Sequence, residues 1–171
     1  LGTRLKPLTD TIPKAMVPVG NKPLLQHIIE KLKASGFDEL IINVHHFAEQ
    51  IIDFVRANNS FDIRIEFSDE YEQLLDTGGG IKKASWFFDD EKPFLVHNVD
   101  ILSNIDLRNL YHFHTNSNSV ATLVVSGRET SRYLLFDEVN RLAGWINEKS
   151  EETKSPYENF NPLNYKKLAF A

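Results

Sequence analysis

Hydrophobic positions along the chain alternate between two spacings. Stripes at helical spacing predict helices over residues 23–35, 47–57, 80–88 and 106–114. Between them lie short apolar runs rich in β-branched residues, at 39–44, 63–67, 93–98 and 120–125. Such runs are typical of strands buried in a parallel sheet. The alternation of strands and helices predicts an α/β fold, with a mostly parallel sheet covered by helices on both faces.

The pattern changes after Gly127. Short strands are expected at 132–136 and 141–146, joined by the turn DEVN, and the polar stretch 148–164 is expected to be an exposed loop. The chain opens inside a glycine loop with no strand before it, and it stops in LAFA, which is typical of the opening of a strand. We therefore expect a single domain over residues 1–171 that is truncated at both ends relative to the natural protein.

The first 23 residues have neither helical nor strand periodicity. Their prolines exclude a regular helix interior or a central strand, because each removes a backbone donor and fixes φ: Pro7, Pro13, Pro18 and Pro23. The same stretch carries the cations Arg4, Lys6, Lys14 and Lys22. A stiff cationic loop that begins with Gly2-Thr3-Arg4 suits a polyphosphate, since glycine lets backbone amides approach an anion. The residues alone leave open a surface loop with solvated charges.

The composition is that of an ordinary globular protein, since 42% of the 171 residues are hydrophobic and 25% are charged. The net charge of -5 argues against a nucleic-acid partner, whose binding surface would be basic. The absence of cysteine excludes disulfides, thiolate metal sites and cysteine nucleophiles. No apolar stretch approaches the roughly 20 residues of a membrane span. We therefore expect a cytoplasmic protein without a membrane or nucleic-acid partner, and the oligomeric state stays open.

Asp100 is the residue best placed to hold a metal. It follows the predicted strand 93–98, where a carboxylate has no packing role. Ligands of open α/β sheets bind beyond the carboxyl ends of the strands. A lone carboxylate that shares Mg²⁺ with ligand phosphates is a usual arrangement for this cation. The alternative is a helix or turn cap, which is also common for aspartate at such a position.

Three successive glycines, Gly78 to Gly80, follow Thr77 and lead into the predicted helix 80–88. They would let a base or a phosphate approach the backbone at a helix N-terminus, and the alternative is a flexible turn. The run lacks the GxxxxGK[ST] pattern of a P-loop. It also lacks the GxGxxG pattern of a dinucleotide site, because Lys83 stands where the third glycine would be. Neither a P-loop ATPase nor an NAD enzyme is therefore supported.

The remaining polar candidates are weaker. His112 and His114 lie two positions apart on a predicted helix, so they cannot form an i, i+4 metal pair. Of the neighbours His45 and His46 only one can face a site, and we assign no histidine a catalytic role. Glu148 follows a predicted strand and would reach a polar ligand, but the charges around it favour a solvated ion pair.

Taken together, three segments resemble the sugar-phosphate nucleotidyltransferase family, the NDP-sugar pyrophosphorylases. LGTRLKPLT through PKAMVPVGNKPLLQHII resembles the family's signature loop and first helix, and LLDTGGGI and VHNVDIL resemble later segments in the same order. Within the family, the chain is similar to small bacterial N-acetylmuramate-1-phosphate uridylyltransferases and mannose-1-phosphate guanylyltransferases. The resemblance implies a Rossmann-like three-layer sandwich of the nucleotide-diphospho-sugar transferase type. It also implies a Mg²⁺-dependent reaction of an NTP with a sugar 1-phosphate, giving an NDP-sugar and pyrophosphate.

Carried over by position, the resemblance implies three catalytic residues, Arg4, Lys14 and Asp100. Gly2, Thr3 and Arg4 would hold the triphosphate, with Arg4 on the departing pyrophosphate. Lys14 would bridge the phosphates and stabilise charge in the transition state. Asp100 would bind Mg²⁺. No covalent enzyme intermediate is needed, so catalysis would consist of in-line positioning and charge neutralisation.

The resemblance also implies the residues that select the base and the sugar. Gly78 and Gly79, together with Glu70, would line the base pocket. Asn98 would contact the sugar nucleotide, and Glu148 would contact the sugar. The identities of the base and of the sugar stay open, because pocket shape selects them and no short motif fixes it.

The chain departs from the family pattern at three places. Val99 stands where the family commonly has glycine before the metal aspartate. The segment that supplies a second metal aspartate is absent, and so are the first strand and the first glycines of the signature loop. These departures keep a second function open, that of a non-catalytic nucleotide-sugar-binding domain that regulates a partner enzyme.

Overall fold

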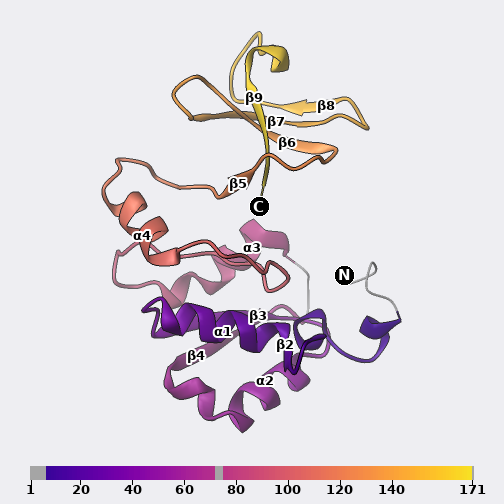
Figure 1. Ribbon diagram of the computed structural model, residues 1–171, viewed down its shortest axis with the longest axis vertical. Helices are drawn as coiled ribbons and strands as arrows, with labels where there is room; N and C mark the ends of the chain where they lie inside the picture. Colours follow the sequence, from indigo (N-terminus) through magenta and orange to yellow (C-terminus); the bar gives the residue numbers. More distant parts are fainter. Residues whose placement is uncertain (1–6, 72–74, 171) are drawn as a thin grey trace. The chain divides into compact units, whose positions relative to one another are not determined.

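The computed structural model describes residues 7–71 and 75–170 of the 171-residue chain. The chain forms two compact units that divide between Asn118 and Ser119, and each is described by itself. Figure 1 shows the helices and the parallel strands in the first unit and an antiparallel sheet in the second.

The first unit begins with short elements and continues as alternating helices and strands. Two 3-10 turns, η2 (Leu8–Asp10) and η3 (Lys14–Met16), precede the antiparallel two-residue strands β1 (Pro18–Val19) and β2 (Lys22–Pro23). The regular elements that follow are α1 (Leu24–Ala34), β3 (Glu39–Val44), α2 (Ala48–Ala57), η4 (Asn59–Asp62), β4 (Arg64–Asp69), α3 (Asp76–Lys83), η5 (Ala84–Phe87) and α4 (Leu107–Thr115).

Most local predictions for this unit are confirmed. Helix α1 buries its stripe of leucine and isoleucine, and Gly36 follows its end at a φ of +94°, which glycine adopts without strain. Strand β3 has the predicted bounds. Helix α4 begins after Asp106, whose side chain accepts a hydrogen bond from the backbone N–H of Asn109 (3.0 Å).

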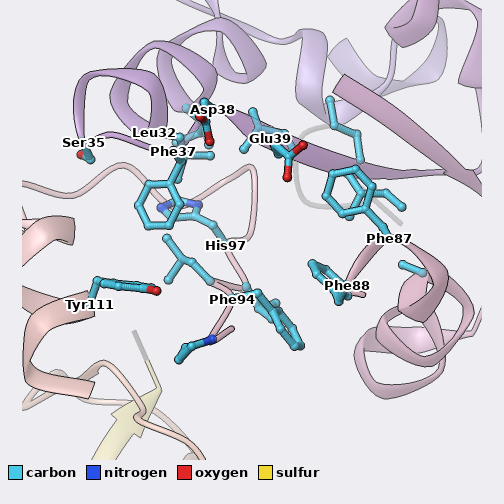
Figure 2. Close-up of a pocket in the computed structure, with 18 of the residues that line it drawn as sticks. Leu32, Ser35, Phe37, Asp38, Glu39, Phe87, Phe88, Phe94, His97 and Tyr111 are labelled. Atoms are coloured by element: carbon cyan, nitrogen blue, oxygen red, sulfur yellow. The ribbon is translucent and has the colours of Figure 1, made fainter. Parts of the chain in front are cut away.

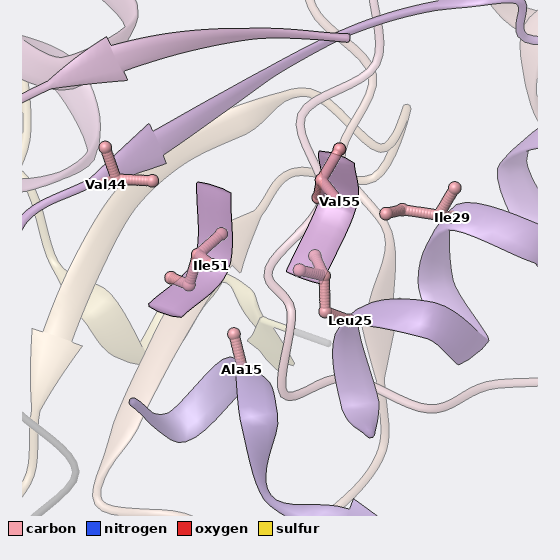
Figure 3. Close-up of a cluster of buried hydrophobic side chains, with 6 residues drawn as sticks. All are labelled: Ala15, Leu25, Ile29, Val44, Ile51 and Val55. Atoms are coloured by element: carbon pink, nitrogen blue, oxygen red, sulfur yellow. The ribbon is translucent and has the colours of Figure 1, made fainter. Parts of the chain in front are cut away.

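Strands β3 and β4 form a parallel pair, in register from Glu39 opposite Arg64 to Val44 opposite Asp69. One face of the pair packs against α1 and α2. Figure 3 shows the buried cluster on this face: Ala15, Leu25, Ile29, Val44, Ile51 and Val55. Successive side chains of a strand point to opposite faces, so Asn43 belongs to the other face, which α3 and η5 approach. There the Arg64 guanidinium lies 5.0 Å from the ring centre of Phe87.

The predicted mostly parallel sheet is not evident. Among the described residues, the parallel pairing is confined to β3 and β4, and the other sheets are antiparallel. Residues 93–98 form no strand, and Phe94 and Val96 are about half exposed. An apolar cavity of about 830 Å³ has both β3 and residues 93–98 in its walls. The prediction of a strand at 93–98 is therefore wrong for this structure, because the segment has no paired neighbour among the described residues.

Two other predicted elements differ from the structure. Helix α3 begins at Asp76, so Gly78 to Gly80 lie inside the helix and not before it, and the helix ends at Lys83. The predicted strand 120–125 is reduced to β5 (Val125–Ser126). A helix tolerates three glycines at a cost of about 1 kcal/mol each relative to alanine, so tertiary contacts must hold α3.

The second unit is a five-stranded antiparallel sheet with the order β5-β9-β6-β7-β8. Strands β6 (Arg132–Phe136) and β7 (Leu142–Asn147) confirm the predicted hairpin, and the Asp137 side chain accepts from the backbone N–H groups of Val139 and Arg141 in its turn. The LAFA segment is part of β9 (Lys166–Phe170). The expected loop 148–164 contains β8 (Glu152–Lys154) and the 3-10 turn η6 (Pro162–Asn164).

Candidate functional site

Lys14 and Asp100 form an ion pair in the first unit. The Lys14 ammonium donates a hydrogen bond to Asp100 Oδ2 across a separation of 86 residues in the chain. Around Lys14, Pro13, Ala15 and Val17 are buried, which anchors the loop and leaves the lysine side chain about one-third exposed. The structure therefore brings together two residues that the sequence assigns to one site. It also shows that part of the proline-rich loop is packed into the core.

Asp100 lies in a turn that the hydrophobic core supports. The backbone N–H of Ile101 donates to the Asn98 carbonyl (3.2 Å), and the Val99 side chain packs against both buried clusters of the unit. Val99 therefore anchors the turn from its apolar side. The Asp100 side chain keeps 40% of its accessible area, so a cation can reach it.

Asn98 is exposed and borders the apolar cavity. The ring of the preceding His97 donates from Nδ1 to the Asn98 carbonyl (2.8 Å). Partial burial lowers the pKa of His97 below 6.5, and the Asn98 carbonyl opposes this shift more weakly. His97 is therefore neutral near pH 7 and acts as a packing and turn-forming residue.

The glycines of α3 have different surroundings. Gly78 is exposed, and a Cβ placed on it would meet no atom of the described residues within 4 Å. A Cβ on Gly79 would lie 2.8 Å from the Cβ of Leu75. A Cβ on Gly80 would lie 2.3 Å from Asn43 Nδ2 and 2.5 Å from Glu70 Oε1, closer than real side chains come. Open space for a ligand thus lies beside Gly78, and close packing requires glycine at Gly80.

Glu70 is buried, with 5% of its area exposed. Its Oε1 accepts from the Asn43 side chain (3.0 Å), and its Oε2 accepts from the backbone N–H of Leu75 (3.2 Å). The resemblance places Glu70 in a base pocket. The contacts of its carboxylate are with the protein itself.

The apolar cavity lies between β3, the residues near η5 and the segment 93–98. Figure 2 shows aromatic side chains, among them Phe37, Phe88 and Phe94, pointing into it. The rings of Phe88 and Phe94 stack with their centres 4.0 Å apart. Asn43, Thr77 and Asn98 also line this cavity, so it adjoins the polar residues of the candidate site.

Other expected site residues lie in the second unit or outside the described residues. Gly2, Thr3 and Arg4 lie outside the described residues. Glu148 belongs to the second unit, where its Oε1 accepts from Lys167 Nζ (2.7 Å) beside a shallow cavity of about 450 Å³. The sugar-binding role of Glu148 stays a prediction.

The described residues contain no group of three or more histidines, cysteines or carboxylates that would hold a metal by themselves. Within the same residues, every helix is too short or too polar to cross a membrane. A metal at Asp100 would therefore need ligands from the substrate, as Mg²⁺ commonly has.

Sequence reasoning missed Asn43, and it missed the contact of Gly80 with Glu70 and Asn43. Asn43 stands near the end of the apolar run ELIINV, which is a signal for a polar group at a strand end. Gly80 was included in the glycine run, but its contact with Glu70 depends on how α3 crosses β3. These features define an α/β protein whose polar residues gather beyond the end of a parallel pair of strands.

The chain belongs to the nucleotidyl transferase family, whose model matches residues 1–154. It is 35% identical over 134 residues to a UTP–glucose-1-phosphate uridylyltransferase from Synechocystis, covering 72% of this chain and 34% of the relative. It is 42% identical over 102 residues to an N-acetylmuramate alpha-1-phosphate uridylyltransferase from Caulobacter vibrioides. This match covers 58% of this chain and 42% of the relative. The chain thus spans about a third to two fifths of the length of these curated relatives.

Solved structures are similar to the whole chain. HddC from Yersinia pseudotuberculosis has a TM-score of 0.69 and 28% identity, covering 91% of this chain and 68% of its own. A UDP-glucose pyrophosphorylase complexed with UDP-glucose has a TM-score of 0.67 and 18% identity. This match covers 99% of this chain and 70% of the pyrophosphorylase chain. The second likeness shows the fold alone, and both support the α/β class predicted from the sequence.

Proposed function

We propose that the protein catalyses nucleotidyl transfer from an NTP to a sugar 1-phosphate. A phosphate oxygen of the sugar 1-phosphate attacks the α-phosphorus, and the bond from the α-phosphorus to the bridging oxygen breaks. The products are an NDP-sugar and pyrophosphate. The observation that carries this proposal is the pairing of Lys14 with Asp100 in a chain of the nucleotidyl transferase family.

Such a reaction needs positioned charge and no enzyme nucleophile, because the transition state spreads negative charge over phosphate oxygens. Lys14 lies next to Asp100, so its ammonium would reach the phosphates that a cation at Asp100 holds. Arg4 would hold the departing pyrophosphate. The free space beside Gly78 would admit the base or a phosphate next to the helix backbone.

The residues present fit a magnesium ion as the family resemblance implies. Asp100 offers an accessible carboxylate oxygen, and Mg²⁺ is commonly bound by one or two carboxylates together with substrate phosphates. When bound, the ion would neutralise phosphate charge. Lys14 would then leave Asp100 and contact a phosphate, since both cations compete for the same carboxylate.

The relatives support this class of substrates. Two of them are named as uridylyltransferases of glucose 1-phosphate and N-acetylmuramate 1-phosphate, and a third, 36% identical, as a mannose-1-phosphate guanyltransferase from Yarrowia lipolytica. A structure of HddC, 26% identical, contains GMP-PN. The relatives differ in both base and sugar, so we propose a nucleoside triphosphate and a hexose-type 1-phosphate without naming either.

The test is an assay of pyrophosphate release with each common NTP and a panel of sugar 1-phosphates, with Mg²⁺ present. Release with one pair supports the proposal. Lys14→Ala should lower turnover by about a hundredfold or more, because one positioned charge donor is removed from the transition state. Lys33→Ala is the matched control, since Lys33 lies outside the loop, pairs with Asp62 (3.4 Å) and should leave turnover unchanged.

No release with any pair would overturn the proposal. Calorimetric binding of a nucleotide sugar without turnover would then favour the regulatory binding domain. The observation that keeps this second function open is that the described residues hold no group of three or more histidines, cysteines or carboxylates for a metal.

A further inference from the structure

We propose that Glu70 is a positioning residue that orients the glycine helix α3 towards the nucleotide, and is not itself a ligand of the base. The inference rests on the proposed function for its ligand, an NTP. Its structural basis is the contact of Glu70 with Asn43, Leu75 and Gly80.

Both carboxylate oxygens of Glu70 are engaged within the protein. Oε1 accepts from Asn43 at the end of β3 (3.0 Å), and Oε2 accepts from the backbone N–H of Leu75, directly before α3 (3.2 Å). The residue is 5% exposed, and a buried carboxylate is costly unless such hydrogen bonds satisfy it. The side chain therefore links β3 to the start of α3.

The backbone of Glu70 is tied to the same strand end. Its N–H donates to the Val44 carbonyl (2.8 Å), and its own carbonyl accepts from His45 Nδ1 (2.9 Å). With the backbone held on both sides, the carboxylate has little freedom to turn towards a ligand. A base could donate to the same carboxylate only through the 5% of the residue's area that stays exposed.

Gly80 shows how closely α3 packs on the hydrogen-bonded pair Glu70 and Asn43. A Cβ at Gly80 would be 2.5 Å from Glu70 Oε1 and 2.3 Å from Asn43 Nδ2. The helix backbone thus rests directly on the Glu70–Asn43 hydrogen bond, which sets the separation between α3 and β3. Two residues earlier, Gly78 is exposed and has open space beside it. Glu70 therefore sets the position of Gly78 through the packing of α3, although its own side chain does not reach the space beside Gly78.

The experiment compares Glu70→Ala and Glu70→Gln with the unchanged chain. Steady-state kinetics give kcat and KM separately for the NTP and for the sugar 1-phosphate. Glu70→Ala should raise the KM of every NTP by about tenfold and leave the KM of the sugar 1-phosphate within about twofold. Glu70→Gln should restore most of the NTP affinity, because its amide oxygen still accepts from Leu75 and its amide nitrogen can donate to a reoriented Asn43 side chain.

A direct contact with the base gives a different result. Glutamine would then present a donor where the base meets a carboxylate, so Glu70→Gln would change the preference among NTPs. Such a change in preference, or an unchanged KM in Glu70→Ala, would overturn the inference. Equal weakening for all NTPs with rescue by glutamine supports it.

Amide hydrogen exchange separates this inference from the proposed function, because it needs no substrate. In Glu70→Ala, amides in the second half of α3 should exchange at least about tenfold faster, while those of α1 keep their rates. Unchanged exchange in α3 would overturn the positioning role. Failure of the unchanged chain to bind any NTP would overturn the proposed function and leave the exchange result readable.

Discussion

Lys14 and Asp100 form an exposed ion pair, for which we predict a large effect on activity and a small effect on stability. Their side chains are 35% and 40% exposed, and exposed ion pairs contribute less than about 1 kcal/mol to folding. A phosphate that binds with its cation would exclude water from the same two charges, which strengthens the attraction of Lys14 to the phosphate and of Asp100 to the cation. The pair is therefore better suited to binding a ligand than to holding the fold.

We predict that Asp100→Asn lowers turnover by about a hundredfold or more, because the carboxylate that would hold the cation is lost. The free energy of unfolding should change by less than about 1 kcal/mol, since the pair is exposed. Pyrophosphate release and urea unfolding measure the two effects. Asp90→Asn is the control, because Asp90 pairs with Lys92 (2.9 Å) in another exposed ion pair. Equal turnover in both variants would contradict the role of Asp100.

His97 gives a prediction for stability as a function of pH. Partial burial lowers its pKa in the folded state below 6.5, so the unfolded chain binds the proton more readily. The contribution of neutral His97 is present above about pH 6.5 and is lost as the pH falls through the depressed pKa. His97→Gln should therefore reduce the loss of thermal stability on acidification below pH 6.5. His46→Gln is the control, because His46 is exposed. If His97→Gln loses as much thermal stability on acidification as the unchanged chain, the prediction is wrong.

At the scale of elements, the sequence predicts what depends on neighbours in the chain. Helix α1 and strand β3 were predictable because a stripe or an apolar run of the right length contains the information. Residues 93–98 have the composition of a strand, but a strand also needs a hydrogen-bonded neighbour, which composition does not provide. The residues of the candidate site likewise fall into those that the local sequence predicts and those that depend on tertiary contacts. Asp100 was marked by its own position, whereas the contact of Gly80 with Asn43 arises from the crossing of two elements.

Helix α3 offers a matched pair of glycine substitutions. Gly80→Ala should destabilise the protein by about 1–3 kcal/mol, because the added methyl group overlaps Asn43 and Glu70. Gly78→Ala should be neutral or stabilising by up to about 1 kcal/mol, since its Cβ has room and alanine favours a helix. Urea unfolding followed by circular dichroism measures both. Equal effects of the two substitutions would show that α3 does not rest on the Glu70–Asn43 pair.

At the scale of the whole molecule, the parallel sheet has two strands, and the apolar cavity lies beside one of them, β3. Strand β3 pairs with β4 along one edge, and its residues Leu40 to Asn43 also line the cavity, with Leu95 to Asn98 among the other lining residues. A six-residue strand such as β3 is about 20 Å long. Among the described residues, the other edge of β3 has no paired strand, and residues 93–98 have none on either side.

The first described residues of the chain lie against α2 and Asp100. The Thr11 carbonyl accepts from Gln50 of α2 (3.0 Å), and Lys14 contacts Asp100, beyond the end of residues 93–98. A strand that entered the cavity parallel to β3 would lie beside the edge of β3 that has no partner among the described residues. It would then hydrogen-bond to β3 on one side and to residues 93–98 on the other, which would extend the parallel sheet.

We predict that an N-terminal extension of valine and isoleucine, about six residues long, slows amide exchange in β3 and in residues 93–98 by at least about tenfold. The physical reason is that new ladder hydrogen bonds and apolar contacts would form on both sides of the added strand. An extension of equal length made of glycine and serine is the control, because it cannot fill an apolar cavity. Slower exchange that appears in the unextended chain at high protein concentration would instead assign the cavity to a second copy. Exchange that stays fast under all three conditions would show that the cavity does not accept a strand.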